Sequence, residues 1–301
     1  MGFLDLCWKY KLTYLSYKNY LYVMLCMHKR NKKEQKGTKI SVILKNDNKY
    51  DWTFQQVFMY SLLHEKYTNI SFPELADDLN NNCLHLKYNN KTIVLYNCIN
   101  NGDIHGVFLS EEYKFLNVKN ETVIDIGANI ADSSIYFALN DAQKIIALEP
   151  YPYSYNSAKK NIEINDLDNK IDLLNAAYGQ DKKINIDDKK MVNNASSLTT
   201  TEEGKEIDSY SLKTLIKKYN VSSAVLKMDC EGCEYNLLNE ETETLRKFKR
   251  IQIEYHYKHE PLVNKLKTAG FNVKYTKATK LYNSNAENPY MTIGQIYAVK
   301  I

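Results

Sequence analysis

From about residue 120 onward, short apolar runs alternate with longer stretches in which apolar residues recur every three or four positions. The runs over 122–126 and 224–229 are typical of strands buried on both faces. The stretch over 261–269 has the spacing of a helix. This alternation predicts a mostly parallel sheet covered on both faces. A final apolar run over 295–301 has no helix after it and predicts an antiparallel last strand.

The first part of the chain has a different pattern. Two short alternating runs, 85–88 and 92–96, flank a pair of asparagines and predict a β-hairpin between helical stretches. We therefore expect an α+β accessory region over residues 1–118 and a second domain over 119–301.

Apolar residues at steps of three and four over residues 1–28 predict a helix, and basic residues follow it up to Lys36. Such a segment could lie on a membrane surface or bind a partner. Because tyrosines dominate the stripe and Lys9 and Lys11 interrupt it, we favour a helix packed on the protein's own body. A weak peripheral membrane contact through residues 1–36 remains the alternative.

Composition narrows the class of protein. With 301 residues, 44% of them hydrophobic, the chain can form a sizeable core. A net charge of +4 is too small to predict nucleic acid as the main partner. Scattered cysteines and the lack of a cleavable signal peptide predict a reducing, cytoplasmic location. No apolar run reaches the ~18 residues that a membrane span needs. The oligomeric state stays open.

A tight turn and a helix start follow the run over 122–126. Asp125 ends the strand, Gly127 and Asn129 tolerate a left-handed backbone, and Asp132 can cap the next helix. In nucleotide-binding α/β folds, such a turn brings backbone N–H groups close to a ligand. Only one of the three fingerprint glycines is present, so the turn alone is a weak signal.

Glu149 ends the next strand about 20 residues beyond the turn, where an acid can accept both hydroxyls of an adenosine ribose. A surface acid before a helix-starting proline is the alternative, but the interval favours the ribose role. Small residues after the third strand would leave room for an adenine. We therefore predict that an adenosyl ligand is held by Asp125, Gly127, Ala128, Asn129, Asp132, Glu149, Asn175 and Ala176.

Two further strand ends carry groups suited to chemistry. Lys227 lies inside an apolar strand, where an unpaired charge is costly, so we expect it to pair with Asp229. Glu231 follows, and Glu254 and His256 share one face of the next strand. The pair could simply fix the loop. We favour a direct role in a site, because ligands bind at the carboxyl ends of such strands.

Four segments in this order resemble the FkbM family of S-adenosylmethionine-dependent methyltransferases. They are Val123-Ile124-Asp125-Ile126-Gly127-Ala128-Asn129-Ile130-Ala131, Leu148-Glu149-Pro150, Leu226-Lys227-Met228-Asp229-Cys230-Glu231-Gly232-Cys233-Glu234 and Ile253-Glu254-Tyr255-His256. The resemblance covers roughly the last 180 residues, the length of one domain. The family has glycine at the position of Ala131, and small or apolar residues at Cys230 and Cys233. The resemblance implies a class I Rossmann-like, doubly wound α/β sheet and methylation of a hydroxyl on a sugar or secondary metabolite.

In such an enzyme the cofactor supplies the reactive methyl group, and the protein binds and aligns. The acceptor oxygen must lie ~3 Å from the methyl carbon and lose its proton. We expect Asp229, Glu231 or His256 to take that proton, and Lys227 to orient the carboxylate or the hydroxyl. A divalent cation held by Asp229, Glu231 and His256 is an alternative. No spacing is diagnostic of a metal, so we predict none.

Cys230 and Cys233 could form a redox pair after a strand. A zinc site would need a second ligand pair nearby, which the sequence lacks. We favour small buried thiols.

The expected function is O-methylation of a small-molecule or carbohydrate hydroxyl, without a nucleic-acid partner. One alternative is a nicotinamide-dependent oxidoreductase, which shares the ribose acid but usually keeps more glycines in the turn. The other is a non-catalytic binding protein of the same fold.

Overall fold

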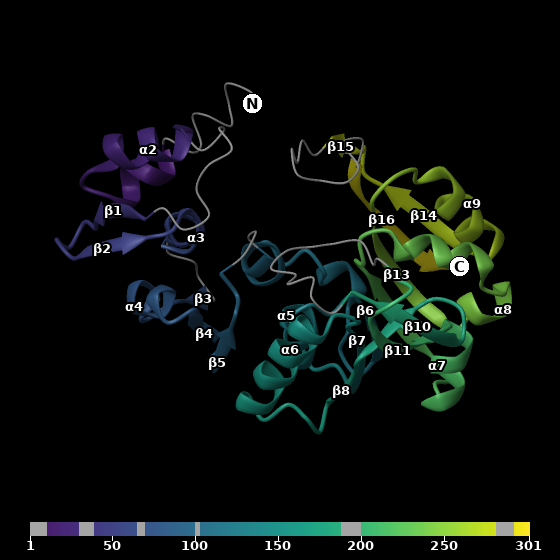
Figure 1. Ribbon diagram of the computed structural model, residues 1–301. Coiled ribbons are helices and arrows are strands. Elements are labelled where there is room, and N and C mark those ends of the chain that lie inside the picture. Colours follow the sequence, from purple (N-terminus) through teal and green to yellow (C-terminus); the bar gives the residue numbers. More distant parts are fainter. Residues whose placement is uncertain (1–10, 30–38, 65–69, 100–102, 188–199, 281–291) are drawn as a thin grey trace. The chain divides into compact units, whose positions relative to one another are not determined.

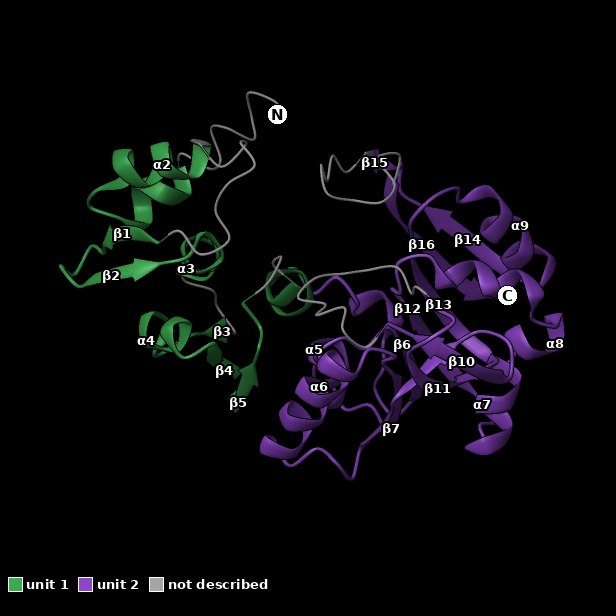
Figure 2. Ribbon diagram, viewed as in Figure 1, with its two compact units in different colours: residues 1–110 green, residues 111–301 purple. Residues whose placement is uncertain are grey.

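The computed structural model describes residues 11–29, 39–64, 70–99, 103–187, 200–280 and 292–301 (Figure 1). The chain divides into two compact units, residues 1–110 and residues 111–301 (Figure 2). The division comes before the boundary at 118/119 that the sequence suggested. The short helix η2 (Lys114–Leu116) contacts strands of the second unit, which is why it belongs there.

Unit 1 is an α+β unit, and the expected β-hairpin is confirmed as its β4–β5 pair. Helix α3 begins at a capping box formed by Thr53 and Gln56. The elements of unit 1 are α2 (Tyr20–Lys29), β1 (Ile40–Ile43), β2 (Lys49–Trp52), α3 (Phe54–Leu63), β3 (Ile70–Ser71), α4 (Leu75–Asn80), β4 (Cys83–Tyr88), β5 (Lys91–Tyr96) and η1 (His105–Leu109). Strands β1 and β2 form one antiparallel pair, and β3, β4 and β5 form a second antiparallel sheet.

The single helix expected over residues 1–28 is wrong in its described part. Residues 11–16 are helical, but Tyr17 leaves the helix and forms an antiparallel bridge with Leu44 before α2 begins. Tyr17 is fully buried, whereas Leu21, four positions later in the same apolar stripe, is exposed. A long-range strand contact therefore overrides the local helical pattern.

The alternative of a membrane contact concerns residues 1–36. Residues 1–10 and 30–36 lie outside the described residues. In the described part of the chain, no helix has the length and apolar character required to cross a bilayer.

The main sheet of unit 2 has the strand order β14-β16-β13-β12-β6-β7-β8. Its strands are β6 (Thr122–Ile126), β7 (Lys144–Leu148), β8 (Ile171–Leu174), β12 (Ala224–Met228), β13 (Phe248–Tyr255), β14 (Phe271–Tyr275) and β16 (Thr292–Lys300). Neighbours from β13 to β8 pair in parallel, and β16 is antiparallel to β13 and β14. The doubly wound sheet with an antiparallel last strand is confirmed. Its order switches between β6 and β12, where ligands bind in such folds.

The remaining elements of unit 2 are helices around this sheet, a smaller three-stranded sheet beside it, and a short strand that pairs with β16. They are α5 (Asp132–Leu139), α6 (Pro152–Ile164), α7 (Leu212–Lys218), η3 (Cys233–Asn239), α8 (Thr242–Leu245), α9 (Glu260–Thr268), β9 (Ala176–Tyr178), β10 (Lys182–Ile186), β11 (Lys205–Tyr210) and β15 (Thr279–Lys280). Helix η3 ends at an extended residue, Glu240, whose carboxylate accepts the backbone N–H of Leu212 at 2.7 Å.

Successive side chains along β6 and β12 point to opposite faces of the sheet, so the apolar core residues lie on one face and the charged residues on the other. Ile124, Ile126 and Leu226 pack into the main core together with residues of α7 and α9. Asp125 and Lys227 alternate with them and therefore face the other side of the sheet. Hydroxyl groups of α5 contact Asp125 there, so this is the face on which α5 packs.

The turn between β6 and α5 contains three residues with a left-handed backbone, Gly127 (φ 80), Asn129 (φ 49) and Ala131 (φ 68). Gly127 is also required for space, because a Cβ there would collide with the backbone carbonyl of Asp229. The expected capping role of Asp132 is wrong. Ala131 is the N-cap, and Asp132 is the first residue of α5. A left-handed backbone costs a non-glycine residue about 1–2 kcal/mol, so Ala131 is strained.

This strain predicts different costs for two identical substitutions in one helix region. Ala131→Gly and Ala138→Gly each remove one buried methyl group, worth ~0.8 kcal/mol. Ala138 lies inside α5, so its replacement costs about 1 kcal/mol more in helix propensity. At Ala131 the substitution instead relieves the left-handed strain. Both substitutions should lower the free energy of unfolding. We expect the loss for Ala131→Gly to be smaller than the loss for Ala138→Gly by at least ~1 kcal/mol, as measured in urea titrations. Equal losses would contradict a strained turn.

Candidate functional site

Asp125 and Lys227 face each other in register at the carboxyl ends of β6 and β12. Lys227 Nζ lies 3.1 Å from Asp125 Oδ1, with the two side chains 3% and 0% exposed. The same ammonium group donates to the carbonyl of Gly127 at 2.7 Å. The expected ion pair with Asp229 is therefore wrong. Parallel pairing sets Lys227 beside its register partner, whereas Asp229 lies beyond the end of β12.

Asp125 is held by further donors. The hydroxyls of Ser133 and Ser134 donate to its Oδ2 at 2.7 and 2.6 Å. Burial lowers the pKa of Lys227, but the carboxylates of Asp125 and Asp229 outweigh burial and raise that pKa above its ordinary value. The lysine is therefore charged, and Asp125 fixes it and the start of α5.

Glu149 follows β7 and is buried. Its Oε2 accepts the backbone N–H of Asn129 at 2.9 Å, and its Oε1 accepts that of Tyr151 at 2.9 Å. Burial raises the pKa of Glu149 to about 7, although these two hydrogen bonds lower it. Each carboxylate oxygen keeps a second lone pair. Asn175 Nδ2 donates to the carbonyls of Glu149 and Pro150 at 3.0 and 2.9 Å and fixes this strand end.

Most of the predicted cofactor residues lie together on the β6–α5 turn, namely Asp125, Gly127, Ala128, Asn129 and Asp132. The N–H groups of Gly127 and Ala128 donate to the carbonyl of Leu148 at 3.1 and 3.0 Å. Burial raises the pKa of Asp132 to about 6. Ala176 is apart from this group, because it lies in β9 and packs into the main core.

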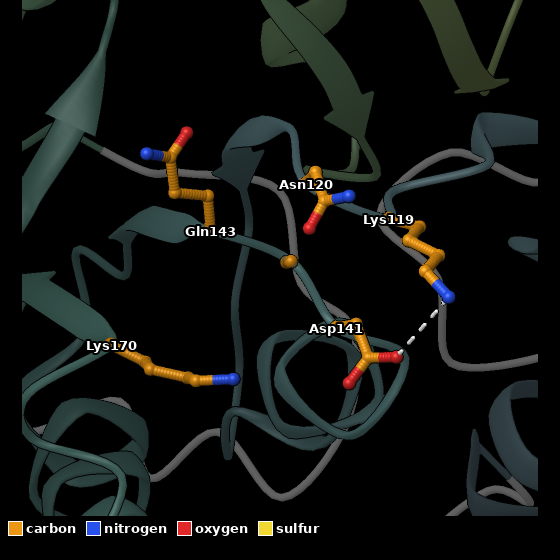
Figure 3. Close-up of a pocket in the computed structure, with 6 residues that line it drawn as sticks. Lys119, Asn120, Asp141, Gln143 and Lys170 are labelled. Atoms are coloured by element: carbon orange, nitrogen blue, oxygen red, sulfur yellow. Dashed lines mark ion pairs between the residues drawn. The ribbon is translucent and has the colours of Figure 1, made fainter.

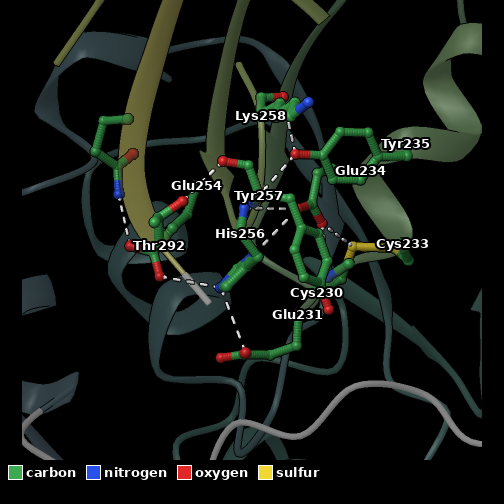
Figure 4. Close-up of polar contacts among 12 residues, drawn as sticks. Cys230, Glu231, Cys233, Glu234, Tyr235, Glu254, His256, Tyr257, Lys258 and Thr292 are labelled. Carbon is green, nitrogen blue, oxygen red and sulfur yellow. Dashed lines mark hydrogen bonds and ion pairs between the residues drawn. A yellow bond between two sulfur atoms is a disulfide. The ribbon is translucent and has the colours of Figure 1, made fainter. Parts of the chain in front are cut away.

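A second group of polar side chains surrounds His256, just beyond β13 (Figure 4). Nε2 of the fully buried His256 lies 3.4 Å from Glu231 Oε2 and 3.5 Å from Glu254 Oε1. Nδ1 lies 3.1 Å from Glu234 Oε1, which also accepts the backbone N–H of His256 at 3.0 Å. The expectation that Glu254 and His256 share a face is confirmed by their contact.

Two residues that the sequence reasoning missed come to this group from just before η2. Tyr113 Oη donates to Asp229 Oδ2 at 3.3 Å, and its ring centre lies 5.6 Å from Lys227 Nζ. Burial, together with the charges of Asp229 and Glu254, raises the pKa of Glu112 to about 8. The segment around them has no periodic pattern, so nothing in the sequence pointed to these residues.

The loop after β12 is closed by a disulfide between Cys230 and Cys233, so the expected free thiols are wrong. Glu231 (φ 55) and Gly232 (φ 117) form a left-handed turn inside it. Glu234 Oε2 accepts the backbone N–H of Gly232 at 2.8 Å. Glu234 is the other residue we missed, although it lies in the segment that carries the resemblance. The disulfide and Glu234 together hold Glu231 against the cluster.

A surface hollow lies at the opposite end of the strands (Figure 3). Its lining residues precede β6, β7 and β8 and are Lys119, Asn120, Asp141, Ala142, Gln143 and Lys170. Lys119 and Asp141 form an exposed ion pair there at 4.0 Å, a kind of contact that adds little stability. The hollow contains none of the predicted site residues.

Comparisons with known proteins identify a domain in this unit. Residues 125–273 match the family model described as the methyltransferase FkbM domain. No curated protein matches the sequence.

Several solved structures are similar to part of the chain. Methyltransferase FkbM from Methylobacillus flagellatus KT shares 15% identity at a TM-score of 0.41, over 60% of this chain and 43% of that one. Precorrin-6y C5,15-methyltransferase from Geobacter metallireducens GS-15 shares 15% identity at a TM-score of 0.36, over 64% of this chain and 87% of that one. An rRNA methylase from Streptococcus thermophilus shares 11% identity at a TM-score of 0.38, over 65% of this chain and 96% of that one. The chain thus spans less than half the length of the FkbM structure.

The buried pair of Asp125 and Lys227 predicts strong coupling. Asp125→Asn and Lys227→Met each leave a buried charge without its partner, so each should lower the free energy of unfolding by about 3–5 kcal/mol. The double variant should lose less than the sum, because it removes both charges. Urea denaturation measures all three. As a control, Lys183→Met breaks the exposed pair with Glu206 and should cost less than about 1 kcal/mol. Additive losses at Asp125 and Lys227 would contradict their coupling.

Proposed function

Residues 125–273 form a methyltransferase domain of the FkbM family, and from this premise we propose that the chain methylates a hydroxyl group of a carbohydrate or small metabolite with S-adenosylmethionine. The observation that carries the proposal is the meeting of two polar groups at the carboxyl ends of β6, β7, β12 and β13. Ligands of doubly wound sheets bind at this edge. The group on the β6–α5 turn, together with Glu149, suits an adenosyl ligand. The group around His256 suits a hydroxyl.

In the proposal, the adenosyl ligand lies against the β6–α5 turn. Glu149 holds the ribose, because each of its oxygens has one lone pair left after accepting a backbone N–H. Asp132 Oδ2 is buried and makes no hydrogen bond within the described part of the chain, so it suits the amino group of the methionine part. Asp125 is already used by Lys227 and two serines, and we assign it to shaping the turn.

The bound cofactor supplies an electrophilic methyl group on a sulfonium, and the residues of this chain do the rest by alignment and proton transfer. Asp229 and Glu231 are partly exposed, whereas His256 is fully buried. A hydroxyl can therefore approach the two carboxylates more easily than the imidazole. We assign proton acceptance to Asp229 or Glu231 and the positioning of Glu231 to His256.

Lys227 takes a different role from the one expected. Its ammonium group is held by Asp125 and by the carbonyl of Gly127, so we assign it to fixing the two strand ends. The FkbM match favours this proposal over a nicotinamide-dependent oxidoreductase and over a non-catalytic binding protein.

The raised pKa of Glu149 predicts how cofactor affinity depends on pH. The ionised carboxylate accepts hydrogen bonds from both ribose hydroxyls, and the protonated form accepts fewer. Because the pKa of Glu149 is about 7, S-adenosylmethionine affinity should rise with pH up to about 7 and then level off. Well below that pH, one proton would weaken affinity about tenfold per pH unit. Calorimetry of the wild type and Glu149→Gln tests this, because the variant should bind more weakly and lose this dependence. No binding by the wild type at any pH would sink the proposal.

Loss of the proton acceptor should affect transfer more than cofactor binding. We expect Asp229→Asn and Glu231→Gln to lower the transfer rate by about 10²–10⁴-fold in one or both variants, with a much smaller change in cofactor affinity. The measurement is S-adenosylhomocysteine release with a panel of hydroxylated sugars and metabolites. Glu121→Gln is the control, because Glu121 pairs with Lys249 and precedes β6. Full activity in both site variants would refute the assigned base.

A further inference from the structure

Acidic side chains outnumber basic ones in the cluster around His256. Four carboxylates belong to it, those of Asp229, Glu231, Glu234 and Glu254. The lysine on the neighbouring strand position, Lys227, is already paired with Asp125. An ionised carboxyl group in such a partly desolvated place is costly without a cation beside it.

His256 is held in the way that is typical of a metal ligand. Glu234 lies 3.1 Å from Nδ1 and is itself fully buried. A carboxylate at Nδ1 keeps the proton on that nitrogen and turns the lone pair of Nε2 toward the other side of the ring. Nε2 is buried there and makes no hydrogen bond of good geometry to any residue that the structure describes.

The atoms around Nε2 are spaced as ligands of one ion would be. Glu231 Oε2 and Glu254 Oε1 lie 3.4 and 3.5 Å from it, beyond the range of about 2.7–3.2 Å for N–H···O hydrogen bonds. Ligands bonded to one octahedral cation at about 2.1–2.4 Å are about 3.0–3.4 Å apart as neighbours and about 4.2–4.8 Å apart as opposites. One donor atom each of Asp229, Glu231 and His256 lies within 4.8 Å of the others.

We propose that Asp229, Glu231 and His256 bind one divalent metal ion, with Glu254 beside them as a further donor. Carboxylates suit Mg²⁺, Ca²⁺ and Mn²⁺, and an imidazole favours transition metals, so Mn²⁺ satisfies both kinds of donor. Ion binding by these side chains goes beyond methyl transfer and can be measured without it. One consequence rests on the proposed function: the ion would also lower the pKa of an acceptor hydroxyl bound to it.

A second group of possible ligands in the described residues, Asp78, Cys83 and His85 of unit 1, shows a contrasting arrangement. Asp78 Oδ1 lies 2.7 Å from His85 Nδ1, and Asp78 Oδ2 accepts the backbone N–H of His85 at 2.7 Å. Both oxygens are thus engaged at ordinary hydrogen-bond distances, and the group links α4 to β4. The proposal is therefore confined to the cluster around His256.

The test is a titration of the metal-free full chain with Mn²⁺, in which the electron paramagnetic resonance signal of free Mn²⁺ is followed. We expect one bound Mn²⁺ per chain and, in the echo modulation of the bound ion, coupling to an imidazole nitrogen. Glu231→Gln and Glu254→Gln keep the size of side chains that are only 12% and 22% exposed. We expect Glu231→Gln to weaken Mn²⁺ binding by more than about 100-fold, and Glu254→Gln by about 10–100-fold.

The matched control is Glu121→Gln. Glu121 is similarly shielded, at 17% exposed, and pairs with Lys249 at the amino end of β6. Its replacement should leave Mn²⁺ binding unchanged. Circular dichroism of each variant separates loss of a ligand from loss of the fold. If Glu231→Gln is unfolded, Mn²⁺ binding by Glu254→Gln decides the test.

The proposal is overturned if the wild type leaves the Mn²⁺ signal unchanged, if both cluster variants bind as the wild type does, or if bound Mn²⁺ shows no nitrogen coupling. S-adenosylmethionine binding, measured by calorimetry in the presence of a chelator, separates this result from the proposed function. Cofactor binding without Mn²⁺ binding removes the metal site alone. Mn²⁺ binding without cofactor binding removes the methyltransferase proposal alone.

Discussion

A buried ion pair between Asp125 and Lys227 joins the two strands at which the sheet of unit 2 reverses its order. One ammonium group contacts the carboxylate of β6 at 3.1 Å and the carbonyl of Gly127 at 2.7 Å. Removing two such charges from water costs several kcal/mol per ion, so the pair is weak evidence for stability. Its effect is geometric. The hydroxyls of Ser133 and Ser134 complete the shell of Asp125 and bind the start of α5 to the same point.

The ion pair between Asp125 and Lys227 brings the β6–α5 turn and the end of β12 against each other. Gly127 has no room for a Cβ because the carbonyl of Asp229 lies over it, and the backbone N–H of Asp229 donates to Ile126 at 3.1 Å. On the other side, the N–H of Asn129 reaches Glu149. A ligand on the turn therefore has the proposed ribose acid at one end and the proposed proton acceptor at the other, as methyl transfer would require.

The same edge gathers acids whose charged forms are disfavoured by burial. The pKa is raised to about 7 for Glu149, to about 6 for Asp132 and to about 8 for Glu112. Because these folded-state values exceed the unfolded ones, their contribution to stability falls as pH rises from about 4 through those values. The fold thus carries a cost near neutral pH, and such perturbed groups are typical of functional sites. A bound cation of any kind would reduce that cost.

The sequence by itself determined the doubly wound sheet, the position of the turn and the shared face of Glu254 and His256. These follow from periodicity, which is a property of local sequence, and from the rule that the carboxyl ends of parallel strands lie at one edge of a sheet. Only the tertiary structure decided that Lys227 pairs with Asp125, that Cys230 and Cys233 are bonded, and that Tyr113 reaches Asp229 from 116 positions away. Partners of this kind are set by the register between strands and by the path of loops, which no spacing along the chain encodes.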